Sequence, residues 1–376
     1  MTGCSPFELT DAHRALALEA REIASATLRP IAEAGVFGGV NRPLVSALAT
    51  TGLLARVFDE GGGALGLCIL RESLAMECTE AETALAMQGL GGVTIQQGAR
   101  PEVADRWVPA IANGEAVAAF ALSEPEHGTD AGAIELAATG DPEAGYRLSG
   151  IKTWISNAPD ADVYVVFART TPDAGAKGVS AFVVPADSPG LSGEPIELLS
   201  GHPIGRLTFD GVRVPSSNLL GEPDHGFRVA MRTLDRFRPS VGAFAVGMAQ
   251  AALDHAREHA ERRHAFGRPI REFQAVSHPL AEMATRTEAA RLLVYAAAAA
   301  YDAGSPGVTK TSAMAKLFAT ETAQWVVDSA VQIEGAAGLV AGSPLERLYR
   351  EVRAPRIYEG TSEIQREIIA RELYRS

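Results

Sequence analysis

Residues 117–130 carry the sequence VAAFALSEPEHGTD, and the periodicity of the chain changes within this stretch. Its first six residues form an apolar run that predicts a short β-strand. The polar residues Ser123–Asp130 follow, and they gather hydroxyls, carboxylates and a glycine into one turn. Such a loop offers N–H and hydroxyl donors to the polar edge of a ligand. A tight surface turn is the other interpretation that this composition allows.

The segment before this stretch has the periodicity of helices. Leu9-Thr10-Asp11 is a helix start signal, and apolar residues then recur at helical spacing. The pattern returns in residues 43–54, 67–76 and 102–111, the last of which ends at the helix stop Asn113-Gly114. We therefore expect an N-terminal helical domain over residues 1–117.

The segment after the stretch first continues with strands. Short runs rich in valine, phenylalanine and tyrosine are separated by turn residues, and they occupy residues 146–148, 163–168, 179–184 and 207–209. This spacing predicts a middle β domain over residues 118–221, folded as a barrel or a sandwich.

Long, alanine-rich helical patterns then fill the rest of the chain. They cover residues 227–260, 274–303, 308–335 and 362–374. We expect a C-terminal domain over residues 222–376, built as a four-helix bundle. The predicted fold class is therefore mainly α with a central β domain.

Composition narrows the possible functions. The 376 residues are 47% hydrophobic and 21% charged, which is typical of a globular protein rather than a disordered one. A net charge of −12 argues against nucleic acid or an anionic membrane as the main partner. The first residues lack a targeting pattern, and the apolar run 292–301 is too short to span a bilayer. With three cysteines and no C-x-x-C pair, a cytoplasmic protein without integral membrane association is expected.

Two short motifs suggest other functions. Residues 61–66, GGGALG, satisfy the dinucleotide-binding pattern G-x-G-x-x-G, but no regular βαβ alternation follows, so a loop between helices is the better interpretation. His255 and His259 satisfy H-x-x-E-H, a zinc-protease signature, but no third ligand is identifiable and the flanking charges suggest a solvated face. No metal site is therefore predicted.

Six segments, in sequence order, resemble the acyl-CoA dehydrogenase family. They are 119–130 (AFALSEPEHGTD), 150–157 (GIKTWISN), 234–239 (LDRFRP), 263–269 (RHAFGRP) with Phe273-Gln274, 332–335 (QIEG) and 357–366 (IYEGTSEIQR). The resemblance extends from about Phe7 to Tyr374. It implies an FAD-dependent enzyme that desaturates an acyl-CoA thioester by removing an α-proton and passing a β-hydride to flavin N5.

The resemblance also assigns the catalytic base. Glu359 takes the α-proton, a role that suits a carboxylate whose pKa rises when substrate excludes water. Gly360 leaves room for the thioester. Some family members place the base immediately before the residue equivalent to Arg238, where this chain has Phe237, which cannot accept a proton. A bulky Phe237 is expected to narrow the acyl pocket.

Further roles follow from the resemblance residue by residue. The expected FAD-binding residues are Phe120, Leu122, Ser123, Thr129, Trp154, Ser156, Arg263, Phe266, Gln274, Gln332, Gly335, Thr361 and Glu363. The expected substrate-binding residues are Thr129, Asp235, Arg238 and Gly360. The chain departs from the family pattern at Ala336, at His127 and in residues 200–206 (SGHPIGR), and these positions have no assigned role.

Family membership implies partners as well. We expect a homotetramer with FAD at a subunit interface, an electron-transfer flavoprotein as oxidant, and a place in fatty acid metabolism. The alternatives are an acyl-CoA oxidase, a dehydrogenase of a carrier-protein-bound acyl chain in a biosynthetic pathway and, from another class, a zinc metalloprotease. A flavin monooxygenase of the same fold usually lacks the carboxylate base, so Glu359 argues against it.

Overall fold

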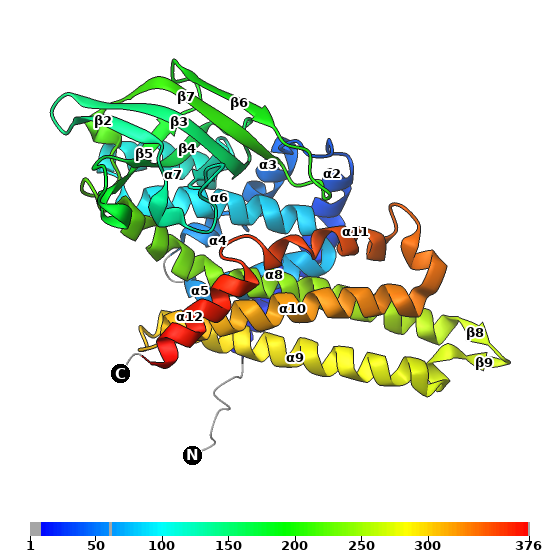
Figure 1. Ribbon diagram of the computed structural model, residues 1–376. Helices are drawn as coiled ribbons and strands as arrows, with labels where there is room; N and C mark the ends of the chain where they lie inside the picture. Colours follow the sequence, from blue (N-terminus) through cyan, green and yellow to red (C-terminus); the bar gives the residue numbers. More distant parts are fainter. Residues whose placement is uncertain (1–8, 60–61, 375–376) are drawn as a thin grey trace. The chain divides into compact units, whose positions relative to one another are not determined.

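A computed structural model describes residues 9–59 and 62–374 and divides the chain into two compact units. The first unit consists of Met1–Ala26, Gly61–Glu82 and Asp235–Ser376, and the second of Thr27–Glu60 and Thr83–Leu234. Both units are discontinuous in sequence. The order of helices, then strands, then helices confirms the predicted fold class (Figure 1).

The second unit contains one seven-stranded mixed sheet. Its strands are β1 (Ala118–Ala121), β2 (Ala137–Asp141), β3 (Gly145–Ser156), β4 (Val163–Arg169), β5 (Val179–Pro185), β6 (Leu191–Pro195) and β7 (Ile204–Val214). The order is β1-β4-β2-β3-β7-β6, and β5 pairs with β4. Strands β4 and β5 are buried along almost their whole length, whereas β7 alternates between buried and exposed residues. One sheet therefore has a fully buried centre and a half-exposed margin.

The second unit also contains helices. They are α2 (Arg29–Glu33), α3 (Arg42–Thr50), α4 (Ala55–Phe58), most of α6 (Thr79–Gly98) and α7 (Pro101–Ala112). Asn41 caps α3, because its side chain accepts a hydrogen bond from the Leu44 amide at 3.0 Å. Helix α6 and the polar strands β2 and β6 were not predicted from the sequence.

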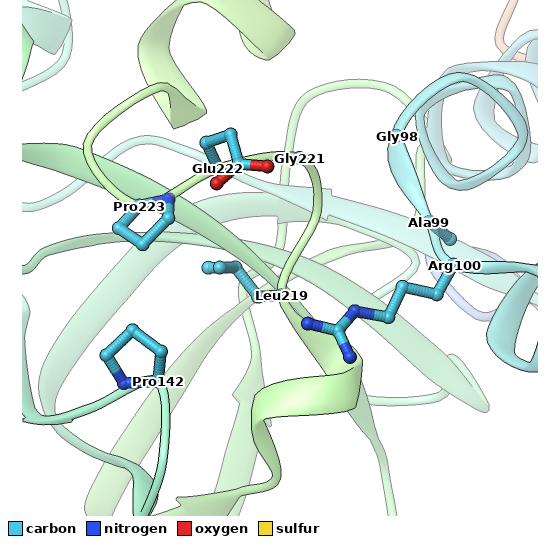
Figure 2. Close-up of a pocket in the computed structure, with 8 residues that line it drawn as sticks. All are labelled: Gly98, Ala99, Arg100, Pro142, Leu219, Gly221, Glu222 and Pro223. Atoms are coloured by element: carbon cyan, nitrogen blue, oxygen red, sulfur yellow. The ribbon is translucent and has the colours of Figure 1, made fainter.

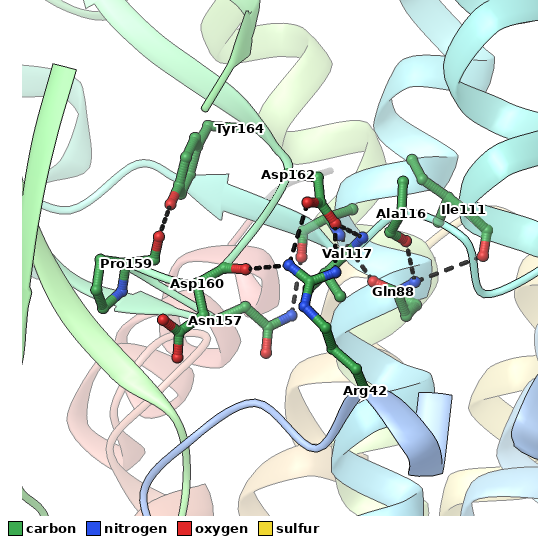
Figure 3. Close-up of polar contacts among 11 residues, drawn as sticks. Arg42, Gln88, Ile111, Ala116, Val117, Asn157, Pro159, Asp160, Asp162 and Tyr164 are labelled. Carbon is green, nitrogen blue, oxygen red and sulfur yellow. Dashed lines mark hydrogen bonds and ion pairs between the residues drawn. The ribbon is translucent and has the colours of Figure 1, made fainter. Parts of the chain in front are cut away.

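A polar cluster ties the start of β1 to the segment that follows β3 (Figure 3). The Arg42 guanidinium binds both carboxylate oxygens of Asp162, at 2.8 and 3.1 Å. Asp162 in turn accepts the Val117 amide at 2.7 Å, and the Asn157 side chain donates to the Ala118 carbonyl at 2.8 Å. These bonds fix the first strand against the end of β3, where the predicted flavin residues lie.

The first unit is a helical bundle. It contains α1 (Asp11–Ile23), α5 (Gly63–Glu77), the greater part of α8 (Gly226–Arg262), α9 (Gln274–Asp302), α10 (Val308–Glu334), α11 (Pro344–Glu351) and α12 (Ser362–Leu373). A short hairpin of β8 (His264–Ala265) and β9 (Arg268–Pro269) joins α8 to α9. Figure 1 shows α8, α9 and α10 side by side. Alanines dominate the core between these helices, and small side chains let helix backbones approach closely.

Gly247 marks the closest approach of α8 to α5. A Cβ atom at this position would lie 2.5 Å from the Glu72 carbonyl oxygen and 2.6 Å from the Ala75 Cβ. Neither neighbour is the end of a flexible side chain, so only glycine fits without a shift of the helices.

We therefore predict that Gly247→Ala destabilises the protein by about 1–3 kcal/mol, as expected for overpacking of a close-packed core. Gly66→Ala is the matched control, since Gly66 is also helical but has nothing within 4 Å of the added Cβ. That variant should stay within about 1 kcal/mol of the wild type, because alanine is the better helix former. Denaturant unfolding of both variants tests the prediction, and equal midpoints would refute it.

Candidate active site

Glu359 lies in a strained turn between α11 and α12. Its φ of +51° is unusual for a residue with a Cβ, and Gly360 follows at +89°. Residues held in this left-handed region cluster at functional sites, where surrounding contacts enforce the strained conformation. The turn therefore marks Glu359 independently of any sequence motif.

Two buried side chains hold this turn from behind. The Lys316 ammonium donates to the Gly360 carbonyl at 2.7 Å, and the Gln365 amide donates to the carbonyls of Glu359 and Gly360 at 3.2 and 3.0 Å. Lys316 and Gln365 are fully buried. A Cβ on Gly360 would lie 2.6 Å from the Gln365 Nε2, so glycine is required here. Thr361 then caps α12 by accepting the Ile364 amide.

The Glu359 carboxylate is poised to accept a proton. The residue as a whole is partly exposed, but its Oε2 atom is buried and has no hydrogen-bond partner among the described residues. Burial raises the pKa of the carboxyl, and the positive charges of Arg71, Lys316 and Arg238 oppose the rise. An unpartnered carboxylate oxygen with an elevated pKa is suited to general base chemistry.

Asp235 and Arg238, the predicted contacts of CoA, bind each other in the structure. The Arg238 Nη1 lies 2.7 Å from the Asp235 Oδ1, while the Arg238 Nε is buried and lacks a partner in the described part of the chain. Phe237 between them is fully buried. Arg238 also contributes positive charge at Glu359, so the structure brings it together with the predicted base.

Trp154 owes its position to a bulge in β3. The pairing with β7 shifts between Lys152 and Ile155, so one extra residue is inserted. Lys152 and Thr153 are consequently both buried, and Trp154 lies exposed at a φ of +58°. The indole is 54% exposed, so a large part of this aromatic surface is accessible to a ligand.

The loop after β1 is fastened to this bulge. The buried Lys152 ammonium donates to the Leu122 carbonyl and to the Glu124 carboxylate, both at 2.8 Å. Glu124 also accepts the amides of Glu135 and Leu136, at 2.6 and 2.9 Å. Sequence reasoning assigned no role to Lys152 or Glu124. The sequence signal that points to them is a pair of opposite charges, one in each of two neighbouring motifs.

The predicted hydroxyl residues have different surroundings. Ser123 precedes Glu124, and its carbonyl accepts the Thr153 amide at 3.0 Å. Ser156 ends β3 and contacts the His202 ring at 2.8 Å, while Thr129 is exposed. The His127 backbone exchanges two hydrogen bonds with the Glu124 backbone, and its Nε2 atom lies 3.7 Å from the Glu135 Oε1. An exposed aromatic wall with fixed hydroxyls and amides beside it fits a flavin ring.

Several other predicted FAD residues lie at one end of the helical bundle, whereas Thr361 and Glu363 lie at the start of α12. Phe266 occupies the tip of the β8–β9 hairpin, is 95% exposed and has a φ of +51°. Arg263, Gln274 and Gln332 are also exposed, and the His259 ring lies 3.8 Å from Glu334, which joins the ends of α8 and α10. Figure 1 shows this hairpin at the opposite end of the bundle from α12. The structure does not bring these residues to Glu359 of the same chain.

The two competing motifs have structural explanations. The first residue of the glycine-rich motif, Gly61, lies outside the described residues, and Gly63 opens α5. The Asp302 carboxylate accepts the Ala64 and Leu65 amides at 2.6 and 3.0 Å, so a side chain occupies the donors that a pyrophosphate would need. Residues 53–58 contain a turn and α4 rather than a strand.

The residues of the zinc motif are part of a regular helix. Both histidines lie in α8, and His259 faces Glu334. In residues 9–59 and 62–374, no group of three or more His, Cys, Asp or Glu side chains is arranged to hold a metal ion. Over the same residues, no helix is long and apolar enough to cross a membrane.

A separate surface depression of about 330 Å³ lies in the second unit (Figure 2). Its lining is Gly98, Ala99, Arg100, Pro142, Leu219, Gly221, Glu222 and Pro223. Arg100 extends from the segment between α6 and α7, and Glu222 lies across from it (Figure 2). None of the predicted site residues lines this depression.

Comparison with known proteins identifies the family. Profiles described as the N-terminal, middle and C-terminal domains of acyl-CoA dehydrogenase match residues 10–115, 119–212 and 224–374. The chain therefore belongs to the acyl-CoA dehydrogenase family. It is an FAD-dependent oxidoreductase that acts on the CH–CH group of acyl-CoA thioesters.

Individual relatives agree over nearly the whole chain. The short-chain specific acyl-CoA dehydrogenase of Rattus norvegicus mitochondria is 40% identical over 98% of this chain and 92% of its own length. The acryloyl-CoA reductase (NADH) of Anaerotignum propionicum is 38% identical over 98% of this chain and 95% of its own. The butyryl-CoA dehydrogenase structure from Megasphaera elsdenii superposes with a TM-score of 0.92 at 33% identity, covering 99% of this chain and 100% of its own. The metalloprotease alternative is not favoured by any of these matches.

We predict that Glu359→Gln raises the thermal unfolding midpoint of the FAD-saturated protein at pH 8. Burial raises the pKa of the Glu359 carboxyl in the folded state, so the wild type loses stability as pH rises above the unfolded pKa of about 4.3. Glutamine removes this charge, so the variant should be more stable than the wild type at pH 8, where the carboxyl of the unfolded wild type is ionised. Well below pH 4 both states of the wild type are protonated, and the gain should vanish. A gain that grows toward acid pH would contradict the assignment.

Proposed function

We propose that the chain desaturates a short-chain acyl-CoA between Cα and Cβ, with Glu359 as the base that removes the α-proton. The observation that carries this proposal is the turn at residues 357–361, which presents a buried, unpartnered Glu359 Oε2 on a strained backbone. A purely structural glutamate would be expected to use both oxygens in hydrogen bonds.

The surrounding charges set the proton affinity of Glu359. Burial raises the pKa of the carboxyl and so makes the carboxylate a stronger base, and the positive charges of Arg71, Lys316 and Arg238 oppose that rise. Lys316 and Gln365 fix the turn, so the carboxylate is placed before substrate arrives. When bound, FAD accepts the hydride from the β carbon.

The other site residues keep the roles that the family resemblance implies. On this proposal FAD contacts Phe120, Leu122, Ser123, Thr129, Trp154, Ser156, Arg263, Phe266, Gln274, Gln332, Gly335, Thr361 and Glu363. Substrate contacts Thr129, Asp235, Arg238 and Gly360. The exposed Trp154 and Phe266 support the assignment, because both aromatic rings are available for contact with a ligand. The domain limits 1–117, 118–221 and 222–376 belong to the same proposal.

A short acyl chain is favoured by two observations. The relatives named above include a short-chain specific dehydrogenase, a butyryl-CoA dehydrogenase and an acryloyl-CoA reductase. In addition, Phe237 puts a large, fully buried side chain next to Arg238. A carrier-protein-bound chain or a longer acyl group fits these observations less well.

The proposed assembly is a cytoplasmic homotetramer that passes electrons to an electron-transfer flavoprotein in fatty acid metabolism. The exposed apolar residues Phe266, Leu339 and Val340 support an oligomer. Light scattering should give four times the chain mass of 39.5 kDa. Anaerobic reduction of an electron-transfer flavoprotein, set against the rate of reoxidation in air, separates a dehydrogenase from an oxidase.

The role of Glu359 is tested by anaerobic bleaching of the flavin with short acyl-CoA substrates. We predict that Glu359→Gln slows bleaching by about 10²–10⁴-fold, the range for loss of a general base. Glu367→Gln is the matched control, since Glu367 is an exposed carboxylate on α12. If the Glu359→Gln variant bleaches as fast as wild type while FAD stays bound, the mechanism is wrong.

The role of Phe237 is tested by chain length. Phe237→Ala should raise the rate with longer acyl-CoAs relative to butyryl-CoA by about 10-fold or more, because a methylene in an apolar pocket is worth about 1–3 kcal/mol. Phe244→Ala is the control, since Phe244 is another buried phenylalanine of α8 in the bundle core. An identical chain-length profile for the two variants would show that Phe237 does not line the acyl site.

A further inference from the structure

His202 lies in the one segment that does not match the family pattern, and the structure brings it to a predicted flavin residue. Its Nε2 atom is 2.8 Å from the Ser156 Oγ, which is hydrogen-bonding distance. Residues 200–206 thus contact a predicted flavin residue, although their sequence does not match the family pattern.

The backbone fixes this contact. Ser156 is paired with Ile204 in the ladder of β3 and β7, and the Asn157 amide donates to the Pro203 carbonyl at 2.9 Å. His202 therefore contacts Ser156 from the segment just before β7, and the pairing of β7 with β3 fixes the register of that strand. Gly201 lies under the Phe37 ring, where an added Cβ would be only 3.1 Å from the ring edge. The position of the imidazole is consequently determined by its neighbours on both sides.

The imidazole is electrically neutral at physiological pH. Burial lowers the pKa of His202 to about 4. A neutral imidazole has one donor nitrogen and one acceptor nitrogen, and its tautomer sets which of the two faces Ser156. It can therefore orient the proton of a hydroxyl without adding charge to the site, whereas a hydroxyl with no such partner rotates freely.

We propose that His202 is a positioning residue for the flavin, which orients the Ser156 hydroxyl and so determines the hydrogen bond that Ser156 makes to the isoalloxazine ring. This rests on the proposed function, in which FAD contacts Ser156, and on the family resemblance, which implies that this hydroxyl bonds near flavin N5. N5 is an acceptor in the oxidised ring and carries a proton in the reduced ring. A hydroxyl of fixed direction therefore favours one redox state over the other, and the reduction potential of bound FAD depends on His202.

A double-mutant cycle tests this coupling. The variants are His202→Leu, which keeps bulk and removes the hydrogen bond, Ser156→Ala, and the two combined. His202→Gln serves as the conservative variant, because its amide retains a polar group at similar reach. The readouts are the midpoint potential of bound FAD and its visible absorbance maxima, measured on the holoenzyme.

His202→Leu should change the ratio of affinities for reduced and oxidised FAD by about tenfold, which is about 30 mV for a two-electron couple. Ser156→Ala should shift the potential in the same direction, the double variant should match Ser156→Ala alone, and His202→Gln should stay near wild type. If His202→Leu releases FAD, the same cycle is measured in the FAD dissociation constant. A purely space-filling histidine predicts additive losses and no rescue by glutamine.

The outcomes separate this inference from the proposed function. A wild-type protein without bound FAD would overturn both. A yellow wild type whose His202→Leu variant keeps the wild-type potential overturns the inference alone, as does a double variant whose shift is the sum of the single shifts. Loss of bleaching in Glu359→Gln with no effect of His202→Leu would leave the proposed function intact.

Discussion

The hydrogen bond from the buried Lys316 ammonium to the Gly360 carbonyl is the contact on which the catalytic geometry depends. It crosses from the middle of α10 to a turn that no regular element contains. Because Glu359 has a positive φ, the turn would relax without such a restraint. The same cation lies close enough to oppose the effect of burial on the Glu359 carboxyl, so one side chain controls both the position and the ionisation of the base.

Much of the architecture could be predicted from the sequence because its periodicity is strong. The helix start at Thr10, the buried strands β4 and β5 and the long bundle helices all follow the apolar pattern. Strands β2 and β6 were missed because their side chains are mostly polar or glycine, and β6 is almost wholly exposed. Helix α6 was missed because its own apolar residues are distributed around the whole helix. The sequence therefore lacks the one-sided apolar stripe that predicts a helix.

The site residues were predicted from short continuous motifs. This method finds only residues that lie within such motifs. Glu359, Trp154 and Ser156 lie within continuous segments that can be compared with a family. Lys316 and His202 act on those segments from far along the chain, and nothing local in sequence reveals a hydrogen bond to a distant carbonyl or hydroxyl. The bulge at Trp154 was not predicted either, because the pairs Lys152-Thr153 and Trp154-Ile155 break the alternation without showing which residue is inserted.

The division of the chain into discontinuous units has a consequence for its synthesis. The sheet-containing unit is complete once Leu234 has left the ribosome, whereas the helical unit also needs residues 235–376. Until then Arg71 and Glu72 on α5 lack Ser240 and Arg291, the partners that satisfy them in the finished bundle. During synthesis the sheet-containing unit can therefore fold first. The apolar surfaces of α1 and α5 stay exposed until the last third of the polypeptide has been made.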